Sequence, residues 1–243
     1  MNKGVDLLVS KIGGFKQNPD KPLQVQVEGR NYLRVTIQTH FITTEDNYTD
    51  LVKEYVIPEY KEGDVLILSE KIISITQNRL VHKDQMNLSF LAKFLSKFVH
   101  ITPAGQGVGN PYKMQVAINS AGPFRVLIAA LAAAITKPFG IKGVFYKVVG
   151  HDVWGIDGFN DLAYEYYDNK GILTPRSPDK VCNEIKHKFN IKAVIADAND
   201  LNVEILGKSS NVNLKEDILQ QVLADNPAGQ KNEQTPIILI REV

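Results

Sequence analysis

The segment with the clearest capacity for chemistry is VIADANDLN, residues 194–202, in which a small apolar run ends in Asp197, Asn199 and Asp200. Carboxylate and amide oxygens are the ligands that Mg²⁺ and Mn²⁺ prefer, and substrate phosphates commonly complete the coordination of these ions. The segment therefore indicates a divalent-metal site. The alternative is a simple turn after a strand, because Asp and Asn are also common turn residues.

A second segment of this kind is VVGHDVWGIDGFND, residues 148–161. Four ionisable side chains lie among its glycines, namely His151, Asp152, Asp157 and Asp161. Ligands gather at the carboxyl ends of the strands in α/β folds. If both segments follow strands of one sheet, we expect them to converge on one cation. His151 would then be a ligand or a base, unless its imidazole only donates to a loop carbonyl.

Donors for phosphate are expected in VLILSEKIISIT, residues 65–76, where Lys71 and Ser74 are the candidates. The alternative is that Lys71 only faces solvent. We expect this segment to form one or two strands interrupted by polar residues. A P-loop is not expected at Gly207-Lys208-Ser209, because Asn202 occupies the position of the first glycine that this motif requires.

The periodicity of apolar residues predicts the elements that position these side chains. Strands are expected at 23–29, 32–42, 144–150, 192–200 and 235–243, the last of them central because both its faces are apolar. Helices are expected before Pro58 and at 87–99, 124–135, 177–189 and 214–225, and the glycine-rich segment 102–114 is expected to be a loop. A helix followed directly by an apolar strand predicts an α/β fold with a mixed sheet.

The length of 243 residues suits a leader at 1–30 and a single domain at 31–243, or two intimate lobes in place of that domain. The net charge of +1 gives no bulk electrostatic case for nucleic acid or for a charged membrane surface. The helix at 124–135 is almost wholly apolar, so we expect it to be buried on nearly all sides or shared with another subunit.

The cysteine count and the lengths of the apolar segments indicate the redox chemistry and the cellular location of the protein. Cys182 is the single cysteine, which excludes an internal disulfide, and its place among apolar helix positions predicts a packed core thiol. The N-terminal apolar run is too short for a signal peptide, and the longest apolar stretch falls short of a membrane span. We therefore expect a cytoplasmic protein without a membrane partner.

Three blocks of sequence resemble the coenzyme F420-0:L-glutamate ligase (gamma-glutamyl ligase) family. The first reads VTIQTHFITTEDNYTDLVKEYV and then KEGDVLILSEKIISITQNRLV. The second reads VVGHDVWGIDGF and then ILTPRSPDKVCNEIKHKFNIKAVIADAND. The third is the closing TPIILIREV. Together the blocks cover most of residues 32–243, and their order is more specific than any one of them.

The resemblance implies a GTP-dependent ligase that needs Mg²⁺ or Mn²⁺ and works as a homodimer. Such an enzyme activates a carboxylate acceptor as an acyl phosphate, which the amine of L-glutamate then attacks to form an amide. Asp157 and Asp197 match the metal ligands of the family, assisted by Asn199 or Asp200. Weaker matches for nucleotide or substrate binding are Lys71 and Ser74. We also expect His151 and Asp152 to contact nucleotide or substrate, and no catalytic residue is assigned.

One departure from the family pattern bears on function. The strand-end Asp is usually followed by Thr and then by Phe-Gly-Arg-Pro, whereas here Ala198, Asn199, Asp200 and Leu201 follow Asp197. The arginine that would pair with a phosphate or a substrate is therefore missing. A non-catalytic protein that binds a phosphorylated small molecule is one alternative, and a metal-dependent hydrolase is another.

Overall fold

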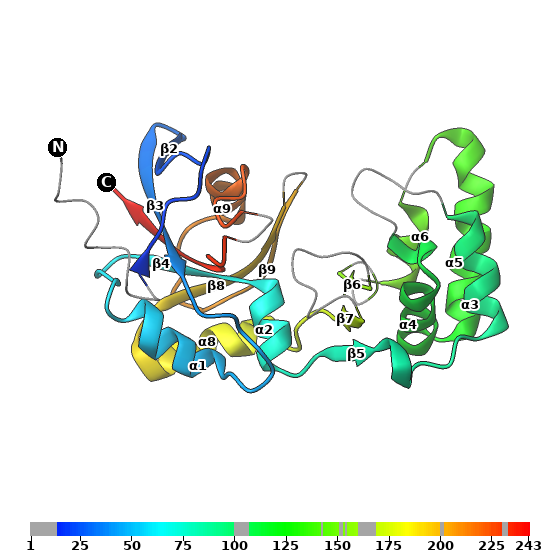
Figure 1. Ribbon diagram of the computed structural model, residues 1–243. Coiled ribbons are helices and arrows are strands. Elements are labelled where there is room, and N and C mark those ends of the chain that lie inside the picture. The colour runs from blue at the N-terminus through cyan, green and yellow to red at the C-terminus, as the bar shows by residue number, and fades with distance from the viewer. Residues whose placement is uncertain are drawn as a thin grey trace, which may run out of the picture. The chain divides into compact units, whose positions relative to one another are not determined.

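The computed structural model describes residues 14–99, 107–141, 143–150, 153, 155–159, 169–199, 202–229 and 233–243. The chain forms two compact units (Figure 1). Residues 1–78 and 175–243 form one, here called the sheet unit, and residues 79–174 form the other, here called the helical unit.

A mixed sheet of seven strands forms the centre of the sheet unit, in the order β1-β3-β10-β4-β8-β9, with β2 paired to β3. The strands are β1 (Gly14–Phe15), β2 (Gln24–Val27), β3 (Arg30–Gln38), β4 (Val65–Ser69), β8 (Lys192–Ala198), β9 (Val203–Lys208) and β10 (Ile237–Glu242). This confirms the predicted α/β class with a mixed sheet. It also confirms the central place of the final strand, which is paired on both sides.

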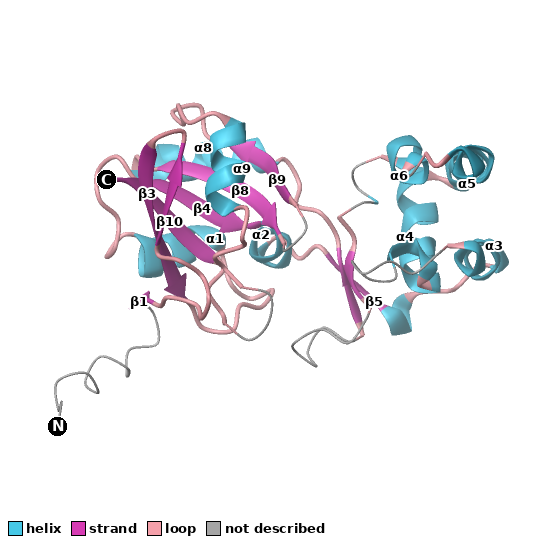
Figure 2. Cartoon of the chain, turned by 90° about the horizontal axis from the view of Figure 1, so that it is seen from above, coloured by secondary structure: helices cyan, strands magenta, loops and turns pink. Residues whose placement is uncertain are grey.

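Helices cover both faces of this sheet (Figures 1 and 2). One face carries α9 (Glu216–Leu223), whose Leu219, Val222 and Leu223 pack in a cluster with β2, β4, β8 and β10. The other carries α1 (Tyr48–Leu51), its π-helical continuation η1 (Val52–Val56), α2 (Glu70–Thr76) and α8 (Pro178–Phe189). The predicted α8-to-β8 unit is confirmed, since Val181, Cys182 and Ile185 of α8 are buried.

The prediction of one or two strands at residues 65–76, interrupted by polar residues, is confirmed for 65–69 and wrong for 70–76. β4 ends at Ser69, and residues 70–76 turn into α2. Isoleucine favours strands locally, but that preference is weak beside tertiary packing. Here Ile72, Ile73 and Ile75 are buried against the sheet and its neighbours. Lys71 and Ser74 therefore lie on a helix rather than on a strand.

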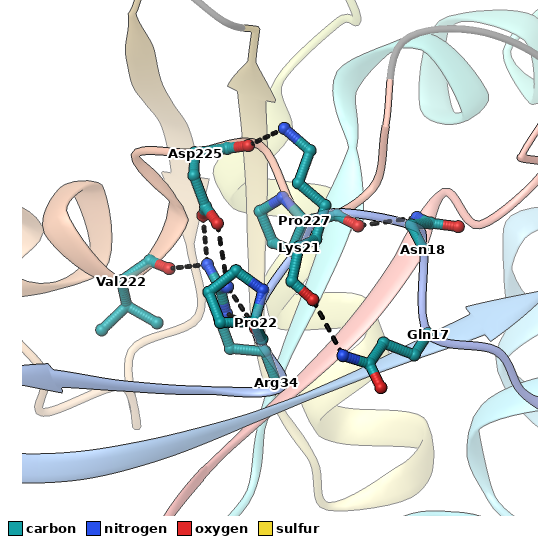
Figure 3. Close-up of polar contacts among 8 residues, drawn as sticks. All are labelled: Gln17, Asn18, Lys21, Pro22, Arg34, Val222, Asp225 and Pro227. Carbon is teal, nitrogen blue, oxygen red and sulfur yellow. Dashed lines mark hydrogen bonds and ion pairs between the residues drawn. The ribbon is translucent and has the colours of Figure 1, made fainter.

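A buried arginine ties the segment before β3 to the loop after α9 (Figure 3). The guanidinium of Arg34 forms a bidentate ion pair with Asp225, and it also donates to the carbonyl of Val222 at 3.0 Å and to that of Pro22 at 3.1 Å. Nearby, the Asn18 amide donates to the Pro227 carbonyl at 2.7 Å. Residues 17–22 thus pack against the sheet unit as part of one polar network.

The helical unit combines a small sheet with short helices. Its strands, in the order β5-β7-β6, are β5 (Leu80–His82), β7 (Lys170–Ile172) and β6 (Asp157–Gly158). Its α-helices are α3 (Phe90–Leu95), α4 (Pro111–Ala121), α5 (Pro123–Thr136) and α6 (Val144–Val149). Single 3₁₀ turns occur at η2 (Lys83–Gln85), η3 (Ser96–Phe98), η4 (Gly107–Gly109) and η5 (Lys137–Phe139).

Three predictions for the helical unit need correction. The segment at 144–150 is helix α6 rather than a strand, because its apolar side chains pack into the helical core rather than onto a sheet. The expected loop at 102–114 contains the start of α4, which Asn110 caps and Pro111 opens. Helix α5 forms as predicted, but of its side chains only Val126 and Ala129 are buried within this chain. Burial on nearly all sides is therefore wrong for the single chain, and the alternative, that α5 is shared with another subunit, stays a prediction.

Over the described residues no single helix is long and apolar enough to cross a bilayer, although the pair 111–121 and 123–139, bent by 118°, passes on length and composition together.

Candidate functional site

Three strands of the large sheet run in the same direction, so their carboxyl ends lie at the same end of the sheet, here called the common edge. β10 is antiparallel to both β3 and β4, and β4 is parallel to β8, so β3, β4 and β8 share a direction. Their register is aligned, because Ile37 pairs with Ile237, Ile237 with Leu68, and Leu68 with Ile195. The residues that follow these strands therefore leave the sheet side by side, which is where α/β folds collect ligands.

The β8 end of this edge carries Asp197 and Asn199, as the sequence predicted. Asp197 is half-buried and faces Glu204 of β9 across the ladder. Asn199 closes the turn that follows, since its side-chain oxygen accepts from the amide of Asn202 at 3.0 Å and its own amide donates to the Asn202 carbonyl at 3.0 Å. Asp200 lies outside the described residues.

The β4 end contributes Glu70 and Lys71, the first residues of α2. Ser69 pairs with Ala196 in parallel register, so Glu70 leaves the edge beside Asp197. Glu70 was not predicted as a site residue, although its polar segment directly after an apolar strand was a usable signal. Lys71 is exposed, whereas Ser74 is fully buried and its hydroxyl has no hydrogen-bond partner among the described residues.

The β3 end carries a cluster that sequence reasoning missed. The His40 ring lies between two groups, with Nδ1 2.6 Å from the Tyr55 hydroxyl and Nε2 2.9 Å from a carboxylate oxygen of Asp46. Asp46 also accepts from the backbone amide of Thr43 at 2.7 Å. A histidine just after a strand, with a carboxylate six residues later, was the available signal.

Burial and hydrogen bonding act in opposite directions on the pKa of Asp46. Desolvation raises the pKa, but the Thr43 amide and the contact with His40 outweigh it, so the pKa of Asp46 lies below its usual value. Desolvation raises the pKa of Tyr55. The tyrosine therefore stays neutral and the carboxylate stays charged through the physiological range.

The second predicted segment does not follow a strand of the large sheet. Asp157 lies in β6, within the helical unit, and its side chain accepts from the Gly158 amide at 2.7 Å. The expectation that two strand ends of a single sheet carry the acidic segments is therefore wrong for residues 148–161, because helix α6 precedes them. His151, Asp152 and Asp161 lie outside the described residues.

The donor chemistry of the edge suits a hard divalent cation. Glu70 and Asp197 supply carboxylates and Asn199 supplies an amide oxygen, the ligand types that Mg²⁺ and Mn²⁺ take. Over the described part of the chain, no group of three or more His, Cys, Asp or Glu side chains is placed to hold a metal. A shared ion between Asp157 and Asp197 stays a prediction.

The P-loop alternative is excluded by packing around Gly207. This glycine lies within β9, and a Cβ placed on it would come within 2.6 Å of the Asp179 backbone nitrogen in α8. The adjacent Lys208 amide donates to the Asp179 carboxylate at 2.9 Å. Gly207 therefore allows a strand and a helix to approach closely, rather than forming a phosphate-binding loop.

Comparison with known proteins agrees with this architecture. The family model described as F420-0:gamma-glutamyl ligase matches residues 36–204, which run from β3 through β9 and include all three ends of the common edge. No curated protein matches the sequence. Because the matched region covers well over half of the chain, the protein belongs to the F420-0:gamma-glutamyl ligase family.

Proposed function

We propose that this protein is a nucleotide- and metal-dependent ligase that joins an amino acid, L-glutamate, to a carboxylate acceptor. The observation that supports this best is the aligned edge of β3, β4 and β8, which lies inside the region matched to the ligase family. GTP is the proposed co-substrate and Mg²⁺ or Mn²⁺ the proposed cofactor. We further propose that the enzyme works as a homodimer in the cytoplasm.

Each proposed role follows from the chemistry of the side chain. Asp157 and Asp197 are the proposed metal ligands, with Asn199 or Asp200 assisting them. A bound divalent cation would supply positive charge against the phosphates of the nucleotide. Exposed Lys71 is placed to offer a further positive charge. Ser74, His151 and Asp152 remain predictions for nucleotide or substrate contact.

The reaction consists of two displacements. A carboxylate oxygen of the acceptor attacks the γ-phosphorus of GTP, the bond from that phosphorus to the β,γ-bridging oxygen breaks, and GDP leaves. The neutral amine of glutamate then attacks the carbonyl carbon of the acyl phosphate, so that a C–N bond forms while phosphate and a proton are released. Both steps depend on positioning and on neutralisation of charge, which acidic and basic residues at one edge can provide.

Titration calorimetry with GTP and Mn²⁺, followed by measurement of released phosphate, tests the proposal. A ligase should bind GTP only with the metal present, and should release phosphate only when an acceptor and glutamate are supplied together. Phosphate release without an amino acid would favour the hydrolase.

A non-catalytic binding protein is the second candidate. It is favoured by one specific observation, the replacement of the family's Phe-Gly-Arg-Pro after the strand-end acid. Binding of GTP without any phosphate release, across a panel of carboxylate acceptors and amino acids, would support this candidate and overturn the ligase.

A further inference from the structure

The helical unit exposes an unusual amount of apolar side chain. On α3 and the 3₁₀ turn that follows it, Phe90, Phe94 and Phe98 form a continuous aromatic row, with ring centroids 5.9 and 5.0 Å apart. Phe90 is 83% exposed and Phe98 is 66% exposed. Aromatic rings of this size normally lie in a core or in an interface.

Helix α5 also exposes apolar side chains. Its exposed side chains are Phe124, Leu127, Ile128, Leu131 and Ile135, a single stripe at helical spacing. The opposite side of α5 carries the buried Val126 and Ala129. The helix therefore turns one apolar face into the core and leaves the other outside it. Phe139 and Ile141, just beyond α5, are also exposed.

The two helices lie on the same side of α4 and α6 (Figures 1 and 2). The exposed apolar residues of α3, α5 and the turns that follow them are here called the apolar face. Its five phenylalanines alone present on the order of 700 Å² of surface. The largest apolar patch on an ordinary monomer is roughly 300–600 Å². The apolar face is therefore large enough to have an occupant.

Charge is segregated onto the same segment. Residues 85–150 contain seven basic residues and no acidic one, which leaves 21 of the 28 basic residues against all 27 acidic residues in the rest of the chain. The net charge of +1 thus conceals a strongly basic segment and an acidic remainder. Five of the seven cations are exposed, namely Lys93, Lys97, Arg125, Lys137 and Lys147.

We propose that the apolar face docks onto an anionic lipid surface, with its phenylalanines and aliphatic side chains entering the interface and the surrounding cations contacting acidic headgroups. Exposed Phe and Leu beside Lys and Arg are the composition of helices that lie in a membrane interface. The long lysine stems keep their charge at headgroup level while the apolar residues enter.

The charged residues of the segment disfavour a protein partner. Protein interfaces are enriched in Tyr, Trp, Phe, Met and Arg, but they are depleted in Lys. Here four of the five exposed cations are lysines, and the two tyrosines of the segment, Tyr112 and Tyr146, are only half-exposed. Pairing two copies through this face would also bring cations from both copies together, with no acidic residue of the segment to neutralise them.

Vesicle flotation of the full chain tests the proposal, with phosphatidylcholine vesicles that contain or lack phosphatidylserine. We expect binding that requires phosphatidylserine and weakens at high salt. Each basic residue near such a surface contributes roughly fivefold in affinity. Lys93→Gln with Lys97→Gln should therefore weaken binding by roughly 25-fold. The matched control, Lys53→Gln with Lys61→Gln, alters exposed lysines of the sheet unit and should change binding less than twofold.

A second pair of variants tests the apolar contribution. Phe90→Ser should weaken vesicle binding by roughly tenfold or more. Ile57→Ser, at an exposed apolar position of the sheet unit, should leave it unchanged. Absence of phosphatidylserine-dependent binding by the wild-type chain would overturn the proposal. So would light scattering that shows an oligomer dissociated by Phe90→Ser, without vesicle binding by the wild type, because a second copy would then cover the face. Neither result depends on ligase activity.

Discussion

Ser69, the last residue of β4, lies opposite Ala196 of β8 in parallel register, and the residue that follows each of them along the chain, Glu70 or Asp197, carries a carboxylate. Glu70 and Asp197 are thereby placed together by backbone pairing alone. Carboxylate oxygens are the ligands that Mg²⁺ and Mn²⁺ prefer, and this register is our reason to expect a cation at the edge.

The first prediction concerns Asp197. Asp197→Ala should abolish turnover, because a proposed metal ligand is lost, while the thermal melt stays nearly unchanged, since the side chain is only half-buried at the end of its strand. Phosphate release and differential scanning fluorimetry measure the two effects. Glu242→Gln is the matched control, because Glu242 lies at the opposite edge of the same sheet. Full activity in Asp197→Ala would contradict the metal assignment.

Lys71 provides a separate test of nucleotide contact. Lys71→Gln should raise KM for GTP by roughly twofold to fivefold, as expected for the loss of a single exposed charge near phosphate. Its melting temperature should not change, because the side chain is exposed. Steady-state kinetics at varied GTP concentration measures the effect, with Lys53→Gln as the control. An unchanged KM would show that Lys71 does not contact the nucleotide.

Close packing between α8 and β9 predicts that Gly207 tolerates no side chain. Gly207→Ala should lower the free energy of unfolding by about 1–3 kcal/mol, the usual range for overpacking, because the new Cβ meets backbone atoms of α8 at 2.6 Å. Urea titration measures this loss. Gly109→Ala serves as the comparison, since its Cβ would reach only ordinary contact with Val99 at 3.5 Å. Equal stabilities for the two variants would be inconsistent with this packing.

The lowered pKa of Asp46 predicts a dependence of stability on pH. A depressed carboxyl pKa stabilises the folded state at any pH above the unfolded value of about 3.9, and this contribution is lost as the pH falls through the folded value. The wild type should therefore exceed Asp46→Asn in stability at neutral pH, and the difference should shrink below about pH 4. Urea titrations of both proteins across this range provide the measurement. A difference that grows on acidification would show that the pKa is not lowered.

Cys182 should be inert in the folded protein. Burial raises the pKa of its thiol to about 12, with Asp179 adding to the effect, so almost no thiolate exists at pH 8. A disulfide reagent should react with it only after denaturation. Rapid reaction of the native chain would place this thiol at the surface instead of in the core.

Local sequence patterns correctly predicted the elements in which the local preference for helix or strand is the same as the structure that tertiary packing favours. The alternation in β3, the apolar final strand and the amphipathic α8 are examples, and the structure confirms all three. Helices α2 and α6 were predicted as strands because isoleucine, valine and aromatic residues favour strands when neighbours are ignored. Both segments are helical because of their packing: α2 packs against the sheet, and α6 packs against other helices.

The candidate site was predictable only in part for a similar reason. The turn after β8 is local in sequence, so Asp197 and Asn199 could be identified directly. The neighbouring contributions of Glu70 and His40 depend on register between strands more than a hundred residues apart, which no single segment encodes. The exposure of α5 was also hidden, because an apolar stripe looks the same whether it faces a core or an outside partner.

The central position of β10 has a consequence for how the chain is made. β10 lies between β3 and β4, so the side of each strand that faces β10 stays unpaired until residues 237–242 have left the ribosome, although β3 can already pair with β2 and β4 with β8. The apolar sides of β3 and β4 that pair with β10 therefore stay without a partner strand while nearly two hundred residues are added after β3. Nascent chains stalled short of residue 237 should be engaged by chaperones and degraded readily, and biogenesis should be completed in one late, cooperative event.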